Sequence, residues 1–590
     1  MMKKLSLKLL QKLSPSFLNE VHITQASRGH TFFRVFEYSV SVASFTLAVT
    51  VICAFVLPLG AAFLPLITDF APFAKNAAAF AMGGTHIFNT AAYTLVVALA
   101  STAVALVVGI AAAFFTANRS FFGRRFLLSL SAVPLCVPPL VIALGFVSVF
   151  GVNGIFNKAI AASFHAEPLT CLYSPLGIII AQGFYNFPLV MLIVSNAWQK
   201  IGRTEIDAAR LLGANEMRIF FTVTVHKLSS AIAASCIPVF LYCFFSFMIV
   251  LLFGAPGSST LEVEIYRAAK ITLDYKTAAT LALIETCCAM LVVIAYSVAK
   301  KSTRAQNASS TQNTPNKKNA PFATSGKTAY VKIAGALYQS RLSKCAERTG
   351  AIFFGATILL FFIFPLMGIA AGALSANSIG TFFAKHAPFA PPFFSQGLRA
   401  ALLGTCIVSP CTATLCVVSA TIYAVFLRMN KHLSHALALQ IIPLMPLAVS
   451  SVVIGYGLTS VVKYTSVFSL VIAQSSLAWP LAFRIVHAAL QAVPQEAIDA
   501  SLLLSTARID TVFRIMLPSV KRSIASAFCF CFAASAGDAA LPLVLAVPKF
   551  DTLALYTYRL ASSYRFAEAC ACGMLLCVLC MTLLWITRKE

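Results

Sequence analysis

The residue types best suited to chemistry in this chain are cysteine, histidine and the carboxylates. Most of the 17 cysteines stand inside apolar stretches such as ETCCAML (285–291) and CACGMLLCVLC (570–580), where cysteine behaves as a small hydrophobe. The cysteines lack structural-zinc spacing with histidine partners, and His432 and His435 stand beside Lys431, which is typical of a solvated loop. No histidine, cysteine and carboxylate cluster stands at the end of an apolar stretch. We therefore expect neither catalytic residues nor metal ligands.

Two polar passages of equal length repeat one pattern. They are DAARLLGANEMRIFFTVTVH (207–226) and DASLLLSTARIDTVFRIMLP (499–518). In the first, Thr204 to Asp207 has the form of a helix capping box, and Gly213 permits a left-handed turn before a second amphipathic segment. We expect a short helix, a turn and a second helix.

The second passage has the same helix-start signals in another form. Pro494 suits a first helical turn, and Glu496 supplies its negative charge. Small residues follow the acid in both passages: Ala208 and Ala209 in the first, Ala500 and Ser501 in the second. Because a helix face made of small side chains lets another surface approach closely, we predict that both helices dock against a partner.

Long apolar segments must position these passages. Of the 590 residues, 59% are hydrophobic and only 11% are charged, which predicts a membrane protein. Runs of about 20 apolar residues can cross a bilayer, and such runs must be helices because backbone groups cannot stay unpaired in lipid. We predict about twelve spans, near residues 38–64, 88–116, 127–150, 174–197, 230–253, 277–300, 350–374, 397–427, 436–460, 467–490, 522–547 and 566–587.

The placement of charge predicts the orientation of these spans. The net charge is +25, and basic residues gather in alternate connections, including ten between residues 300 and 348 against the single acid Glu347. The positive-inside rule puts the N- and C-termini and both polar passages in the cytoplasm. This distribution favours contact with membrane lipid and gives no reason to expect nucleic acid. SGKT (325–328) mimics a phosphate-binding loop, but Pro321 stands where that motif needs glycine, so we expect no nucleotide site here.

The two halves of the chain repeat each other. A shift of 292 residues aligns the polar passages and also pairs Pro188 with Pro480 and Tyr266 with Tyr558. Six-span units return to their starting side, so the copies face the same way in the membrane. We predict a cytoplasmic N-terminal segment (1–37), a first module (38–300), a basic cytoplasmic linker (301–349) and a second module (350–590).

The polar passages resemble a motif of one transporter family. An acid followed by two alanines, then glycine, then Ile-x-Leu-Pro resembles the cytoplasmic loop of binding-protein-dependent ABC importer permeases. The first passage has Val223, Val225 and His226 where Ile, Leu and Pro are usual, and the second has Ser501 and Ser505 for Ala and Gly. The resemblance covers residues 85–300 and 395–587. Within the family, the chain is similar in particular to the fused ferric iron and thiamine permeases. STLEVEIYR (259–267) is similar to an external segment of the same permeases.

This resemblance implies a fold, a function and partners. The implied fold is all-α, with about twelve transmembrane helices as two parallel six-helix repeats of the type I ABC importer permease. The chain would take a small solute, thiamine or ferric iron, from an extracytoplasmic binding protein across the inner membrane by alternating access. Two copies of an ABC ATP-binding subunit would hydrolyse ATP with Mg, and this chain would bind no cofactor. The residues implied to couple to that subunit are Glu205, Asp207, Ala208, Ala209, Gly213, Glu496, Asp499, Ala500, Ser501, Ser505 and Pro518.

Polar residues inside the predicted spans are candidates for the solute path. Asp538 lies late in an apolar span, where it could meet a cationic solute or simply form a polar turn at a helix break set by Gly537 and Pro542. Glu285 is expected to be paired inside the bundle. Further candidates stand at matching places in the fourth spans of the two halves: Gln182, Tyr185, Asn186, Gln474 and Trp479. They line the path or hydrogen-bond between helices.

Two other interpretations of the sequence remain open. One is a secondary carrier with parallel repeats, which would explain the spans but not two same-sided helices of acidic and small residues. The other is an ABC permease for another small solute, such as an inorganic anion or a polyamine.

Overall fold

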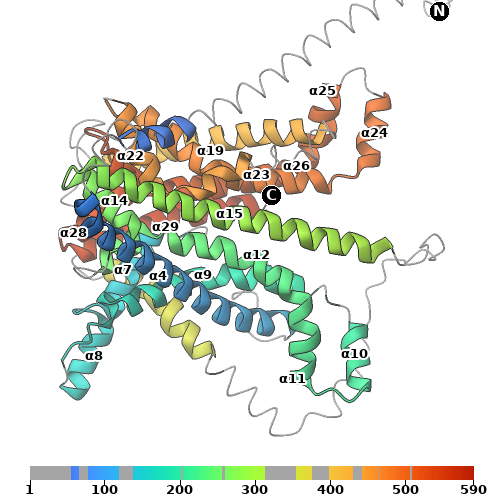
Figure 1. The fold of residues 1–590 in the computed structure, drawn as a ribbon, viewed down its shortest axis with the longest axis horizontal. Coiled ribbons are helices and arrows are strands. Elements are labelled where there is room, and N and C mark those ends of the chain that lie inside the picture. Colours follow the sequence, from blue (N-terminus) through green and yellow to red (C-terminus); the bar gives the residue numbers. More distant parts are fainter. Residues whose placement is uncertain are drawn as a thin grey trace, which may run out of the picture.

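The structure is a computed structural model, and it describes residues 55–65, 77–118, 137–165, 167–199, 201, 203–254, 259–312, 352, 354–374, 397–429, 442–462, 464–504 and 508–589. All regular secondary structure in these residues is helical. Ten of the described helices are long and apolar enough to cross a membrane. Figure 1 shows them running along one another as an elongated bundle. The prediction of an all-α membrane protein is confirmed.

Ten of the twelve predicted spans have a long helix at the expected place. The spans predicted at 38–64 and 436–460 lie partly outside the described residues, and their described parts hold the shorter apolar helices Phe55–Pro65 and Ser451–Val461. The main helices of the first half are α4 (Ala77–Asn118), α7 (Pro139–Phe150), α9 (Pro175–Trp198), α12 (Val225–Phe244) and α15 (Tyr275–Gln312). Those of the second half are α17 (Phe364–Leu374), α19 (Leu398–Met429), α22 (Ser451–Val461), α23 (Val467–Ala492), α26 (Leu517–Gly537) and α29 (Phe566–Lys589).

The 292-residue repeat holds at the level of helix boundaries. Helix α9 begins at Pro175 and α23 at Val467, and the same interval separates the starts of α12 and α26. It also separates two short helices, α14 (Leu261–Lys270) and α28 (Leu553–Ser562), in both their first and last residues. The predicted duplication is therefore a duplication of structure.

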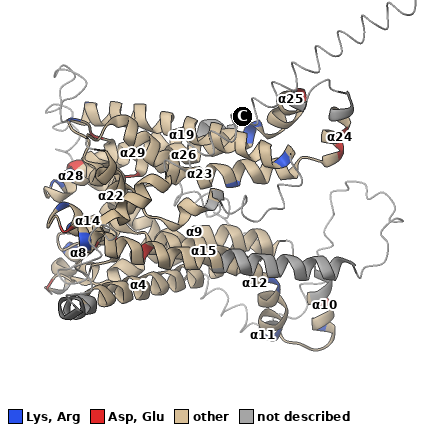
Figure 2. Cartoon of the chain, turned by 45° about the horizontal axis from the view of Figure 1, so that its top comes forward, with Lys and Arg blue, Asp and Glu red and all other residues tan. Residues whose placement is uncertain are grey.

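The two halves point the same way. Each half sends out a pair of short helices: α10 (Arg203–Leu211) with α11 (Glu216–Ile219), and α24 (Gln495–Leu504) with α25 (Arg508–Thr511). Both pairs project from the same end of the bundle in Figure 1, and α14 and α28 lie at the opposite end. Figure 2 shows that charged residues lie mainly at these two ends, with few along the middle of the described chain. The halves are parallel repeats, as their predicted even number of spans requires.

Glycine lets particular helices approach closely. Gly183 of α9 faces α4, and a Cβ on it would lie 2.6 Å from Val104 Cγ1. Between the halves, a Cβ on Gly145 of α7 would collide with the backbone of Pro365 in α17. A Cβ on Gly457 of α22 would likewise collide with the backbone of Pro58. Each half thus packs its first described helix against the other half, and the missing side chains set the spacing.

Replacing Gly183 with valine tests this packing. Gly183→Val should destabilise the protein by about 1–3 kcal/mol, because the new side chain overpacks the contact between α4 and α9. The measurement is the melting temperature of the purified protein. Gly355→Val is the matched control, since a Cβ at Gly355 meets no atom within 4 Å. Equal melting temperatures for the two variants would contradict the close approach of α4 and α9.

Candidate functional site

The first polar passage folds into a helix, a turn and a second helix. Glu205 lies in the first turn of α10, and Asp207 further along forms an exposed ion pair of 3.1 Å with Arg210. The chain then reverses at Gly213, whose φ of 80° is left-handed, as predicted. The Ala214 backbone N–H donates to the Ala209 carbonyl across this turn (3.1 Å). The local sequence therefore closes the loop without help from the rest of the bundle.

The tip of this loop is apolar as well as charged. Leu211 and Leu212 are 89% and 88% exposed. They belong to a loop at one of the two ends of the bundle, where the charged residues lie. Ala208 is exposed beside the leucines, and Ala209 is half-buried. Two large exposed leucines next to small side chains are typical of a surface that another protein covers.

The second passage reaches a similar shape by different contacts. Gln495 Nε2 donates to Asp499 Oδ1 (2.7 Å) along α24, whose first turn also holds Glu496. The Ser501 hydroxyl donates to Thr511 Oγ1 (3.0 Å), which ties α24 to α25. Serine at this position, where the family motif has alanine, thus gains a buried link between the two short helices. Ala500 remains exposed, and Ser505 lies outside the described residues.

Both loops return to the bundle through a π-helical turn. These turns span Phe220–Thr224 and Val512–Met516, which are again 292 residues apart. Each exposes a phenylalanine, Phe221 at 65% and Phe513 at 63%. Pro518 follows exposed in the first turn of α26. The sequence did not predict the π turns, because an α-helix and a π turn share the same apolar pattern.

A cavity of about 270 Å³ lies between the two halves. Three predicted path residues line it: Tyr185, Asn186 and Asp538. Tyr185 donates its hydroxyl to the Val137 carbonyl (3.1 Å), and Asn186 donates its amide to the Gln182 carbonyl (3.0 Å). The Asn186 Oδ1 atom is buried and has no hydrogen-bond partner. This acceptor is closed off even though Asn186 lies in the cavity lining.

The other three predicted path residues lie outside the cavity lining. Gln474 is buried behind it, where its Oε1 accepts from Ser535 (2.6 Å) and its Nε2 is 3.5 Å from Asp538 Oδ2. Trp479 packs edge-on against Tyr423 with ring centroids 5.6 Å apart. Gln182 is buried within α9. The structure therefore places Gln474 and Trp479 in contacts between helices, whereas the side-chain amide of Gln182 is buried without a hydrogen-bond partner.

Asp538 forms the polar turn considered from the sequence and also lines the cavity. It stands in the break between α26, which ends at Gly537, and α27 (Ala540–Leu545). Its Oδ1 accepts from the backbone N–H groups of Ala540 (3.0 Å) and Leu541 (3.3 Å), so it caps α27. The same carboxylate lines the cavity.

Two further carboxylates lie close to this cavity. Glu262 of α14 and Glu285 of α15 are each 1% exposed, and none of their oxygen atoms has a hydrogen bond of ordinary geometry. Glu285 is thus not paired as expected. Burial raises the pKa of Glu262, which lies outside the membrane-spanning helices, and the charge of Glu285 raises this pKa further. The sequence did not reveal Glu262, because the segment STLEVEIYR (259–267) was noted only for its similarity to an external segment of the permeases.

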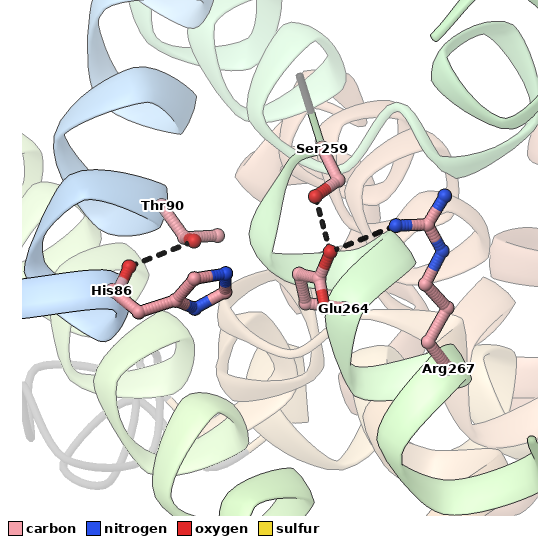
Figure 3. A network of polar contacts seen from close by, with 5 residues as sticks. All are labelled: His86, Thr90, Ser259, Glu264 and Arg267. Carbon is pink, nitrogen blue, oxygen red and sulfur yellow. Dashed lines mark hydrogen bonds and ion pairs between the residues drawn. The ribbon is translucent and has the colours of Figure 1, made fainter. Parts of the chain in front are cut away.

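The neighbouring acid of α14 is fully paired. Figure 3 shows Glu264 between the Ser259 hydroxyl, which donates to it, and Arg267, which lies 3.1 Å away. The start of α14 is held by α4, because the Leu261 N–H donates to Thr94 Oγ1 (2.9 Å). In the second half the Leu553 N–H donates to Thr405 Oγ1 (2.7 Å) in the same way. Both short helices are therefore fixed to their bundles by a repeated contact.

Two parallel helical bundles, a matching loop on each at one end and a cavity between them are typical of a membrane transport protein. The chain matches the family model of the binding-protein-dependent transport system inner membrane component over residues 105–304 and 413–587. The chain belongs to this family, with one match in each half. It is thus a multi-pass inner membrane component of a transport system and not an enzyme.

Curated relatives cover most of the chain. It is 26% identical to the thiamine transport system permease protein ThiP of Brucella abortus (strain 2308) over 86% of this chain and 88% of that protein. It is also 26% identical to ThiP of Escherichia coli (strain K12) over 80% of this chain and 83% of that protein. A putative 2-aminoethylphosphonate transport system permease protein, PhnU of Salmonella typhi, is 31% identical over 32% of this chain and 67% of its own length.

The capping role of Asp538 gives a prediction about stability. Asp538→Ala should destabilise the protein by about 1 kcal/mol through loss of the cap on α27, whereas Asp538→Asn should keep the cap. The measurement is again the melting temperature of the purified protein. If the asparagine and alanine variants lost stability equally, the carboxylate would not act as a helix cap.

Proposed function

We propose that this chain imports a small solute, driven by ATP hydrolysis in separate subunits. Two copies of an ABC ATP-binding subunit, using ATP and Mg, would dock on the α10–α11 and α24–α25 loops. An extracytoplasmic binding protein would deliver the solute to the opposite end, where α14 and α28 lie. This arrangement puts both loops and both termini in the cytoplasm. The proposed modules are residues 38–300 and 350–590, joined by the linker 301–349.

The observation that carries the proposal is the pair of like loops at one end of the bundle. Each presents a short helix with an exposed acid and an exposed alanine: Asp207 with Ala208, and Asp499 with Ala500. The first loop adds two leucines that are almost fully exposed. Two copies of one kind of subunit could bind the two loops, because the loops are related by the duplication.

Docking at these loops would drive alternating access. Shifting a two-state equilibrium from 1:99 to 99:1 takes about 5.5 kcal/mol of differential binding. Subunits that close on ATP would move the two loops together, and each π turn joins a loop directly to a helix of the bundle. The halves meet at the central cavity, so their relative movement would open it to one side and then to the other.

The solute that the relatives favour is thiamine. Two relatives named for thiamine transport align with at least 80% of this chain, whereas the phosphonate relative aligns with 32%. Ferric iron is the second candidate from the sequence. The candidate solute path is formed by Tyr185, Asn186 and Asp538, with Gln474 behind Asp538.

A secondary carrier with parallel repeats is the competing function. It would need no ATP-binding subunit, so copurification of such a subunit with this chain separates the two functions. It would also give no role to the exposed leucines of the first loop or to the exposed alanine of each loop.

Added bulk on the small-residue face tests the docking role. Ala208→Trp and Ala500→Trp should each lower both ATP-dependent uptake and copurification of the ATP-binding subunit at least about tenfold, because loss of close packing at an interface costs more than 1.4 kcal/mol. Deletion of residues 205–213 should abolish uptake.

Ala162→Trp is the matched control, since Ala162 is exposed on α8 (Ile155–Phe164), near the other end of the bundle. It should leave copurification unchanged. Normal uptake and normal assembly after the deletion would refute docking at the first loop.

A further inference from the structure

The two halves differ in length at one connection, at the end of the bundle where α14 and α28 lie. In the second half, five residues (462–466) join α22 to α23. In the first half, 24 residues (151–174) join α7 to α9, and they contain the helix α8. We call residues 151–174 the arm. Because the second half folds without such an arm, the common helical fold does not require it.

The arm leaves and rejoins the bundle at a similar depth in the membrane. Pro139, at the start of α7, and Tyr185 of α9 both line the central cavity. At 1.5 Å per residue, the end of α7 at Phe150 lies about 17 Å along the helix from the cavity lining, and the start of α9 at Pro175 lies about 15 Å from it. Solute sites between transporter repeats lie near the middle of the membrane, and half of its hydrocarbon core is about 15 Å thick. Both ends of the arm therefore lie where the acyl chains meet the headgroups.

The arm is held in a fixed direction at its base. Figure 1 shows α8 pointing sideways, away from the bundle. The Asn157 side chain is buried at 2% exposure, and its Nδ2 donates to the carbonyls of Gly151 and Leu169, each at 2.9 Å. The Leu169 N–H donates back to Asn157 Oδ1 (2.9 Å). One buried amide therefore joins the outgoing and returning segments of the arm.

The exposed surface of α8 is apolar on one face. Phe156 and Ile160 lie one helical turn apart on this face, and Ile155 lies at its edge. Ile155 and Phe156 are 46% and 38% exposed, and Ile160 is half-buried. Lys158, the only charged residue of α8, lies on the opposite face and is exposed. An exposed apolar face opposite a lysine is typical of a helix that lies in the membrane interface.

We propose that the arm anchors the first half in the lipid leaflet at this end of the bundle, with α8 lying in the headgroup region. Ile155 and Phe156 contact the acyl chains, and Lys158 contacts water and the headgroup phosphates. In the orientation of the proposed function, this leaflet is the outer one. The connection of the second half is too short for a helix of this length, so the anchor belongs to one half only.

The competing occupant of this face is the extracytoplasmic binding protein. A protein that delivers solute to the central cavity must sit over the end of the bundle, whereas α8 points to its side. The depth of the arm also favours lipid, because both of its ends lie at the edge of the hydrocarbon core. The inference goes beyond the proposed function, because it requires neither a particular solute nor an ATP-binding subunit.

Fluorescence quenching by phospholipids brominated on their acyl chains tests the contact with lipid. The purified full-length chain is placed in nanodiscs, and Phe156→Trp is compared with Lys158→Trp after subtraction of the signal of the three natural tryptophans. The tryptophan at position 156 should be quenched at least about twofold more than the one at position 158, because only position 156 faces the acyl chains. A melting temperature equal to that of the unmodified chain shows that a variant is folded. Equal quenching at the two positions would overturn the proposal.

The buried amide at the base of the arm has its own test. In the Phe156→Trp chain, Asn157→Ala should lower the quenching at least about twofold, because the three hydrogen bonds that direct α8 are lost. Asn153→Ala is the matched control, since Asn153 is an exposed asparagine of the same arm. It should leave the quenching unchanged. If both alanine variants were quenched like the Phe156→Trp chain, Asn157 would not position α8 in the lipid.

Photocrosslinking in intact cells identifies what covers α8. A photoreactive amino acid at position 156 should form a phospholipid adduct, detected by mass spectrometry of the peptide that contains this position. A crosslink from position 156 to the binding protein in place of lipid would contradict the anchor. These measurements involve neither transported solute nor ATP hydrolysis, so a failure of the proposed transport function would leave them unaffected.

Discussion

Hydrocarbon cannot solvate a charge or an unpaired backbone group, and this constraint organises the whole chain. Charged residues of the described chain lie mainly at the two ends of the bundle, where water can reach them. The polar side chains that remain in the interior pack between helices or face the cavity between the halves. Asp538, Asn186, Glu262 and Glu285 are all of this kind. Few buried positions in the described part of the chain are therefore candidates for contact with a solute.

The duplication produced two copies of one helical fold, and the copies now differ in part of their sequence. The contacts that hold the fold are repeated, as in the Thr94 and Thr405 hydroxyls that receive the first N–H of α14 and α28. The two π turns are repeated to the residue. The cavity walls are not, since Phe245 corresponds to Gly537 and Ser246 to Asp538. The copies have therefore stayed alike in the contacts that hold the fold and have diverged at the cavity.

The sequence predicted the elements well because their signals are local. Apolar length marked the spans, Gly213 marked the left-handed turn, and the 292-residue register predicted the duplication that the starts of α23 and α26 confirm. The site was predicted only in part. Which face of a span meets the cavity depends on helix rotation and packing, so the sequence left open which candidates line it: Tyr185 does, whereas Trp479 packs against Tyr423. Glu262 was missed because part of its surroundings, Ser450 before α22, lies far along the chain.

The most direct test of the account is photocrosslinking from the two loops in the assembled transporter. A photoreactive amino acid placed at position 208, and separately at position 500, should in both cases form a crosslink to the ATP-binding subunit. This result is expected because the two parallel halves present similar helices to two copies of the same ATP-binding subunit. Crosslinks from either position to the extracytoplasmic binding protein, or from only one position to the ATP-binding subunit, would contradict the account.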